Sequence, residues 1–232
     1  MGIAENLSEI RERIRLACLR AGRRPDEVEL CAVSKLHPAS AIAEAYRAGQ
    51  RLFGENYAQE LRDKWTELSS LEGIRFHFIG RLQKNKAKYV APAAETMESL
   101  DSLELASELD RRCAALGRQL SVLVEVNFDE AQKGGIPPAD VPDFLRSLRN
   151  FPNLAADGLM VIPPAGISEE ETRRIFRTLA SLRRAAGLRR LSMGMSHDFE
   201  IAIEEGATIV RVGTAIFGPR PPRKPDAAAS LL

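Results

Sequence analysis

The chain has 232 residues and a formal net charge of +1, with 44% hydrophobic and 28% charged residues, as expected for a globular protein with a sizeable core. The balanced charge excludes the basic footprint of a protein that binds nucleic acid or an anionic membrane surface. No apolar run is long enough to span a bilayer.

Three cysteines, Cys18, Cys31 and Cys113, lie far apart and form no CxxC pair, and their odd number argues against a disulfide framework. The N-terminal residues lack the basic and apolar regions of a signal peptide. We therefore expect a cytoplasmic protein. The sequence does not distinguish a monomer from a weak dimer.

Hydrophobic periodicity predicts a first helix over residues 7–21, with Ile10, Ile14 and Ala17 on one face and Gly22 as the stop. Eight strand-like runs then alternate with seven helical patterns. The predicted strands are 28–33, 51–53, 76–79, 96–100, 121–126, 154–161, 191–192 and 208–212. The predicted helices between and after them are 39–48, 57–68, 83–90, 102–116, 139–148, 169–186 and 197–204.

This alternation implies parallel strands with right-handed crossovers. Eight such units in about 200 to 250 residues predict an α/β fold with a single (β/α)8 TIM barrel over residues 1–218 and one extra N-terminal helix. A doubly wound open sheet is the rival, but it usually has a glycine fingerprint after its first strand, and residues 34–38 (SKLHP) are not one. The proline-rich, basic tail 219–232 is predicted to be disordered.

In such a barrel the active site lies at the C-terminal ends of the strands, and Lys35 follows the first of them. A strand interior excludes an ammonium group, so a lysine at the exit points into a site or out to solvent. A lysine at a barrel mouth can lose its proton and form a Schiff base with an aldehyde. Polar residues at other exits, such as Asp101, Ser102 and Ser196, are also common as helix caps.

The last two units predict a phosphate site. Gly194 and Ser196 precede a helix, and Gly213 and Thr214 follow the eighth strand. Loops in these positions often bind phosphate, because small residues let backbone N–H groups approach the anion. The alternative is two ordinary tight turns. Arg211 alternates with apolar neighbours and is therefore expected to point into the barrel mouth, where it needs an acceptor.

An aldehyde-binding lysine, a phosphate cradle and an inward arginine together indicate pyridoxal 5'-phosphate (PLP). Lys35 would hold the aldehyde, the two turns would hold the phosphate, and Arg211 would face the ring nitrogen. A guanidinium can only donate hydrogen bonds, so it would leave that nitrogen unprotonated and weaken the ring as an electron sink.

Six segments resemble the pyridoxal-phosphate homeostasis protein family: AVSKLHP, FGENYAQE, FHFIGRLQKNK, VNFDEAQKGGI, GLMVIPP and LSMGMSHDFEIAIEEGATIVRVGTAIFG. The resemblance covers residues 28–218 and implies a fold-type-III PLP barrel, related to the N-terminal barrel of alanine racemase. It implies that Lys35 is the Schiff-base lysine and that Arg211 contacts the pyridine nitrogen. The other implied contacts are Ser196, Gly213 and Thr214 to the phosphate, with Asn56 and Met193 around the ring.

Some matched residues have no settled role. Lys84, Lys86 and Lys133 could attract a second anion or relay PLP, although a solvated surface is the simpler interpretation. His197 could modulate phosphate affinity near neutral pH, but we expect it to be exposed. His77 is expected to be a hydrogen-bonded barrel residue.

The resemblance implies a carrier that buffers or delivers PLP inside the cell, without robust catalysis and with PLP-dependent apo-enzymes as candidate partners. The alternative is a PLP-dependent amino-acid racemase, which needs an acid/base group on each face of its substrate. Tyr57 is the only tyrosine near the expected mouth, and we expect no covering domain after the barrel. In a third interpretation, Lys35 is the Schiff-base lysine of a barrel enzyme that acts on a phosphorylated metabolite without PLP.

Overall fold

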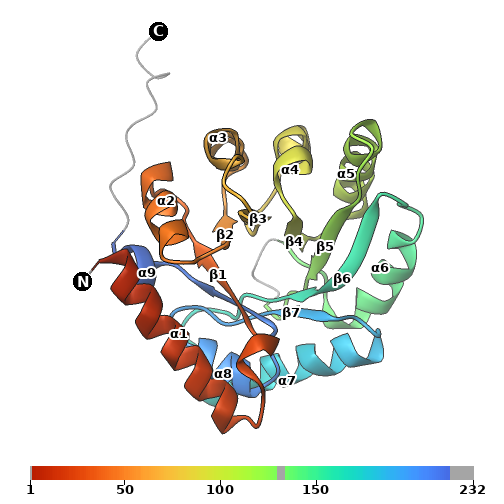
Figure 1. Cartoon of the computed structure of the whole chain (residues 1–232). Helices are drawn as coiled ribbons and strands as arrows, with labels where there is room; N and C mark the ends of the chain where they lie inside the picture. Colours follow the sequence, from red (N-terminus) through yellow and green to blue (C-terminus); the bar gives the residue numbers. More distant parts are fainter. Residues whose placement is uncertain (1, 130–133, 220–232) are drawn as a thin grey trace, which may run out of the picture.

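The computed structural model describes residues 2–129 and 134–219, which form a closed barrel of parallel strands surrounded by helices (Figure 1). Each strand pairs with its neighbour in sequence, and the first strand, Glu29–Val33 (β1), also pairs with the last, Ile209–Val212 (β8). This pairing closes the sheet, so the predicted (β/α)8 barrel is confirmed and the open-sheet alternative is wrong.

The order of elements follows the predicted alternation. The intervening strands are Leu52–Glu55 (β2), Arg75–Phe78 (β3), Thr96–Leu100 (β4), Leu120–Glu125 (β5), Leu154–Met160 (β6) and Arg190–Ser192 (β7). The helices are Ile3–Arg20 (α1), Ala39–Arg47 (α2), Ala58–Leu68 (α3), Ala87–Ala93 (α4), Leu103–Ala115 (α5), Val141–Leu148 (α6), Glu169–Ala185 (α7), Phe199–Glu204 (α8) and Thr214–Phe217 (α9). Short 3₁₀ turns occupy Pro25–Glu27, Lys84–Lys86 and Pro138–Asp140.

Helix α1 covers the side where the barrel closes. Its buried residues recur every three or four positions, which places them on one face: Leu7, Ile10, Ile14, Ala17 and Cys18. This face packs against α2, α8 and α9, and Figure 1 shows α1 lying alongside α8 and α9. The Asn6 side-chain amide also donates to the Ile216 carbonyl at 2.9 Å. Helix α1 therefore supports the segment that follows β8.

The structure has two apolar layers. A large core fills the space between the strands and the surrounding helices. A smaller cluster, made by residues from β1, β2, β5, β6 and β8, is separate from it: Cys31, Leu52, Leu123, Met160 and Ile209. These side chains belong to the inward-facing set of a parallel barrel, which fills its own interior with layers of side chains. The interior is packed and does not form a pore.

Several elements differ from the sequence prediction. Residues 139–148, expected to form one helix, begin within a 3₁₀ turn, and α6 starts at Val141. Residues 83–90, expected to form one helix, instead begin with the 3₁₀ turn and continue as α4 to Ala93, although α4 contains Pro92. Helix α9 has only four residues, too few for a periodicity to be read from the sequence.

The three cysteines are buried and free. No helix in the described parts of the chain has both the length and the apolar character needed to cross a membrane.

The prediction for residues 219–232 concerns a segment that, except for Pro219, lies outside the described residues. Lys133 also lies outside them.

Candidate cofactor-binding site

A cavity of about 120 Å³ lies where the strands β1, β2, β7 and β8 end. Its walls come from loops that directly follow these strands and from the exits of β3 and β6. The lining residues are Val33, Lys35, Asn56, Ile79, Ile162, Met195, Ser196, Arg211, Gly213 and Thr214. The cavity thus lies at the C-terminal face of the barrel, where (β/α)8 proteins place their active sites.

Lys35 enters this cavity two residues after β1 ends. It is half-buried, between the fully buried Ser34 and the half-buried Leu36. Leu36 has a φ of +66°, a backbone conformation that non-glycine residues rarely adopt. The chain therefore turns sharply at the point where it presents the lysine.

The loop after β7 is joined to β8 by a backbone hydrogen bond and is closed on itself by a second contact. The Arg211 amide donates to the Gly194 carbonyl at 2.9 Å, and the Met195 amide donates to the Asp198 carboxylate at 2.6 Å. Gly194 has a φ of +93°, and a Cβ there would lie 2.5 Å from the Ala202 Cβ. Only glycine fits this close approach. The turn brings Ser196 into the cavity.

Gly213 brings the end of β8 against the end of β1. A Cβ on Gly213 would lie 3.1 Å from the Val33 carbonyl oxygen, so the small residue allows close contact between the two chain segments. The hydroxyl-bearing Thr214 follows at the start of α9. Lys35, Ser196, Gly213 and Thr214, which are far apart in the sequence, therefore line one cavity.

Arg211 forms the floor of the site and is only 4% exposed. Its Nη1 donates to the Ser192 hydroxyl at 2.6 Å, and its Nη2 donates to the Val161 carbonyl at 2.8 Å. The Ser192 hydroxyl in turn donates to Glu98 at 2.5 Å. A guanidinium has five N–H donors, and these contacts use two of them. The predicted inward orientation of Arg211 is confirmed.

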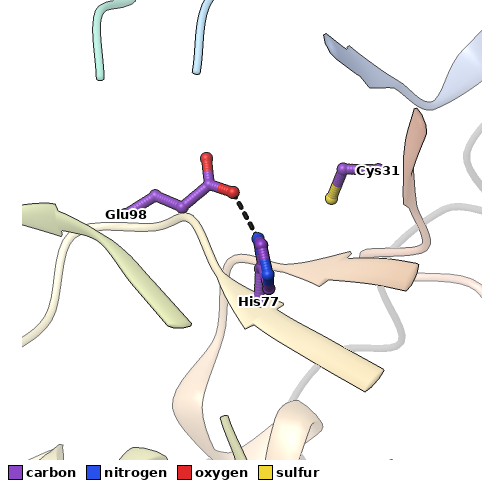
Figure 2. Close-up of side chains that lie close together, drawn as sticks. All are labelled: Cys31, His77 and Glu98. Atoms are coloured by element: carbon purple, nitrogen blue, oxygen red, sulfur yellow. Dashed lines mark hydrogen bonds and ion pairs between the residues drawn. The ribbon is translucent and has the colours of Figure 1, made fainter. Parts of the chain in front are cut away.

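Glu98 supplies the negative charge below Arg211, at 3.9 Å from its Nη1. The His77 Nδ1 donates to Glu98 at 2.5 Å, and Figure 2 shows the two side chains meeting inside the barrel with Cys31 nearby. Burial alone would raise the pKa of Glu98. The hydrogen bonds from His77 and Ser192 and the charges of His77 and Arg211 together lower that pKa. Glu98 is therefore a carboxylate, and His77 is the hydrogen-bonded barrel residue that the sequence indicated.

Cys31, His77 and Glu98 also present sulfur, nitrogen and oxygen atoms that all lie within 4.8 Å of one another, as the ligands of a metal ion would (Figure 2). However, both Glu98 oxygens already accept hydrogen bonds, and Arg211 places a fixed positive charge beside them. Burial raises the pKa of the Cys31 thiol well above its usual value, which opposes the thiolate that a metal requires. We assign this cluster to the positioning of Arg211.

The structure brings together all the residues expected at the site except Met193. Met193 is fully buried in the core between strands and helices, and Met195 lines the cavity instead. Ser102 is a helix cap, because its hydroxyl accepts from the Leu105 amide, whereas Ser196 faces the cavity. His197 is exposed, as expected.

A second cavity, of about 930 Å³, adjoins the first through Asn56, which lines both. Arg81 and Lys86 give it a positive wall, and Tyr57 lines this cavity and not the first. Lys84 lies on the surface and lines neither cavity. The Asn56 Oδ1 atom is buried and has no hydrogen-bond partner among the described residues, so it is available to a ligand.

Sequence reasoning missed the polar residues that support the site, such as Glu98, Ser192 and Lys64. The signal for Glu98 was an acid within a predicted strand, where a charge needs a buried partner. Lys64 gave a weaker signal, since it occupies a position of α3 that the pattern places between Leu61 and Leu68 on the buried face. Neither signal identifies the partner.

Comparison with known proteins gives a consistent result. The family model described as alanine racemase, N-terminal domain, matches residues 6–221. A pyridoxal phosphate homeostasis protein of Aquifex aeolicus is 43% identical over 227 residues, covering 95% of this chain and 99% of the relative.

Two solved structures are similar to the chain. PipY of Synechococcus elongatus, determined with PLP bound, has a TM-score of 0.80 and 42% identity, with 94% of this chain and 100% of PipY covered. An alanine racemase of Clostridium difficile has a TM-score of 0.72 and 16% identity, covering 95% of this chain and 57% of the racemase. The second likeness shows the shared barrel alone.

Proposed function

The chain belongs to the family of pyridoxal phosphate homeostasis proteins, and from that premise we propose that it binds PLP at the strand exits and acts in intracellular PLP homeostasis. The observation that carries the proposal is the cavity in which Lys35, Arg211, Ser196 and Thr214 meet. This donor set fits PLP, because it offers an amine for an aldehyde, hydroxyls for a phosphate and a guanidinium for a ring nitrogen.

Each residue has a separate task in this proposal. Lys35 forms a Schiff base with the cofactor, and Ser196, Gly213 and Thr214 bind its phosphate. Arg211 faces the pyridine nitrogen and is held there by Ser192 and the Val161 carbonyl. The unpartnered Oδ1 of Asn56 accepts a hydrogen bond from the ligand. Ile162 and Met195, which are both exposed, form the apolar wall that Met193 was expected to provide.

Bound PLP supplies an aldehyde and an aromatic ring that withdraws electrons when its nitrogen is protonated. A guanidinium always donates, so Arg211 keeps that nitrogen unprotonated and disfavours carbanion chemistry. The half-buried Lys35 and the exposed Thr214 also leave the ligand in contact with water. These features favour reversible storage or delivery of PLP over catalysis, with PLP-dependent apo-enzymes as recipients.

Absorption spectroscopy of the purified protein during titration with PLP tests binding. We expect a long-wavelength band that saturates, and restored activity when the loaded protein is mixed with a PLP-free apo-enzyme. The absence of a band at excess PLP would make the barrel enzyme acting on a phosphorylated metabolite the leading function. Turnover of L-alanine to D-alanine would favour the racemase alternative.

The phosphate cradle has its own test, in which PLP is compared with pyridoxal, the same molecule without its phosphate. Thr214→Val removes a hydroxyl and preserves the side-chain shape. We expect it to weaken PLP binding by at least roughly tenfold and to leave pyridoxal binding unchanged, since one hydrogen bond to a charged group is worth about 1.5–3 kcal/mol. Thr178→Val, on the exposed face of α7, is the matched control. Equal losses for both ligands would place the phosphate elsewhere.

A further inference from the structure

Lys64 is a lysine in an unusual place, because its side chain is only 6% exposed and lies on the inner face of α3. Its ammonium group donates to three oxygens: the Ser34 carbonyl at 2.8 Å, Glu55 Oε1 at 2.6 Å and Glu60 Oε1 at 2.7 Å. An ammonium group has three N–H donors, so these contacts satisfy all of them. We call Ser34, Glu55, Glu60 and Lys64 the Lys64 clamp.

The Lys64 clamp holds the chain on both sides of Lys35. On the N-terminal side, Lys64 binds the Ser34 carbonyl, and the Ser34 hydroxyl donates to Glu55 at 2.6 Å. On the C-terminal side, the Leu36 amide donates to Glu60 at 2.7 Å. The peptide group before Lys35 is therefore bound by Lys64 itself. The peptide group after Lys35 is bound by Glu60, which Lys64 also contacts.

The backbone at Leu36 needs such support. Among the described residues, Leu36 is the only non-glycine residue with a positive φ. This conformation costs on the order of 1 kcal/mol and persists only where the surroundings hold it. Glu60 holds it by accepting from the Leu36 amide. The strained conformation directs the chain so that Lys35 enters the cavity.

Stability alone does not account for charges in this position. A buried ion pair contributes little more to folding than apolar side chains of the same volume, because removing both charges from water is costly. Glu55 is fully buried, and its second oxygen, Oε2, has no hydrogen-bond partner among the described residues. The Lys64 clamp therefore costs free energy of folding, and it lies directly beside Lys35.

We propose that Lys64 is a positioning residue: through the Lys64 clamp it fixes the backbone on both sides of Lys35 and so sets the affinity of the site for PLP. This inference rests on the proposed function, since it assigns a role in PLP binding to residues that do not line the cavity. Lys64 connects α3 to the end of β1, and it acts on the ligand only through Lys35.

The test compares two alanine substitutions on the same helix. Glu60→Ala removes the acceptor of the Leu36 amide, whereas Glu67→Ala removes an exposed carboxylate one turn beyond Lys64. For Glu60→Ala we expect the dissociation constant for PLP to rise roughly tenfold, as for one hydrogen bond to a charged group. The visible circular dichroism of bound PLP, which reports the asymmetry of its surroundings, should also lose amplitude. Glu67→Ala should match the wild type in both measurements.

Thermal unfolding of the PLP-free variants separates positioning from stability. Glu60→Ala loses the contacts with Leu36 and Lys64 and should unfold at a lower temperature than Glu67→Ala, so PLP binding is compared at a temperature where both variants are fully folded. Lys64→Met is a less selective variant, because it leaves Glu55 buried without a counter-charge and lowers the unfolding temperature. Equal PLP affinity and equal circular dichroism for the two alanine variants would overturn the inference.

Amide hydrogen exchange in the PLP-free protein tests the clamp independently of the cofactor. Glu60→Ala should speed exchange at Leu36, whose amide loses its acceptor, and Glu67→Ala should not. Unchanged exchange at Leu36 would overturn the clamp itself. A wild-type protein that binds no PLP would instead overturn the proposed function, whatever the exchange at Leu36 shows.

Discussion

At the scale of single residues, Arg211 and Lys35 are held in place by different sets of contacts. Arg211 rests on Ser192 and the Val161 carbonyl, with the Glu98 carboxylate behind them. Lys35 is presented by a strained turn that Glu60 and Lys64 stabilise. Each of these side chains is therefore placed by polar residues from other strands and helices, and a site held in this way binds a ligand without first ordering its side chains.

The free energy of unfolding is expected to depend on pH through Glu55. Burial raises the pKa of Glu55 from 4.5 to about 7, although Lys64 and Ser34 act to lower it. Because the folded-state pKa is higher than the unfolded one, Glu55 stabilises the fold below about pH 4.5. That stability is lost as the pH rises through 7, by up to about 3 kcal/mol.

Urea unfolding from about pH 5 to pH 8 checks this expectation. The unfolding free energy of Glu55→Gln should fall less with rising pH than that of the wild type, because glutamine does not titrate. Glu67→Gln, an exposed control on α3, should follow the wild type. Parallel curves for wild type and Glu55→Gln would show that Glu55 does not titrate in this range.

The sequence identified those cavity-lining residues whose position follows from periodicity. Lys35, Arg211, Gly213 and Thr214 lie at or just after the ends of strands, and strand ends can be located from the chain alone. Met193 was expected near the ring from the family resemblance and not from periodicity. Ser192 faces the barrel interior, where it contacts Arg211, so the next residue, Met193, faces the outer core, and Met195 lines the cavity instead.

At the scale of elements, the turn between β7 and α8 is closely packed. Gly194 packs on α8, where an added Cβ would meet both the Ala202 Cβ at 2.5 Å and the Phe199 Cα at 2.8 Å. The same residue's carbonyl accepts from the Arg211 amide. Any shift of this turn therefore moves both Ser196 and the end of β8.

Gly194→Ala tests the importance of this turn. The unfavourable φ and the contact with α8 should together lower the unfolding free energy by about 3 kcal/mol, and displacement of Ser196 should weaken PLP binding. Gly166→Ala is the matched control, since Gly166 has a φ of +80° and open space around its Cβ position. The control should cost about 1 kcal/mol and leave PLP affinity unchanged. Urea unfolding measures the stability of the two variants, and PLP titration measures their affinity. An equal loss of unfolding free energy in Gly194→Ala and Gly166→Ala would mean that the turn relaxes away from α8.

The polar supports of the site could not be predicted from the sequence, because they depend on how elements dock. The contact of His77 with Glu98 needs β3 and β4 in register, and the contact of Ser192 with Arg211 needs the same of β7 and β8. Periodicity gives the face on which a side chain lies and leaves open which side chain of a neighbouring element it meets. The Lys64 clamp likewise depends on the position of α3 against β1.

At the scale of the whole molecule, strand order could be predicted because eight alternating units of this length have few ways to fold. Barrel closure then brings the first and last strands together, so that Lys35 from β1 and Thr214 after β8 line one cavity although the sequence places them at opposite ends of the chain. Helix α1 packs on α9 and ties it through Asn6, which supports the same junction from outside. The fold thus accounts for the position of the proposed phosphate-binding residues beside Lys35.

The central claim is that Lys35 carries the cofactor, and the most direct measurement is borohydride reduction of the PLP-loaded protein followed by peptide mass spectrometry. Reduction makes the Schiff base permanent, so the modified peptide identifies the lysine. We expect the adduct on the peptide that contains Lys35, and its loss from that peptide in Lys35→Ala but not in Lys88→Ala, an exposed lysine on α4. An adduct found only on other lysines of the wild type, such as Lys86 in the neighbouring cavity, would contradict the account.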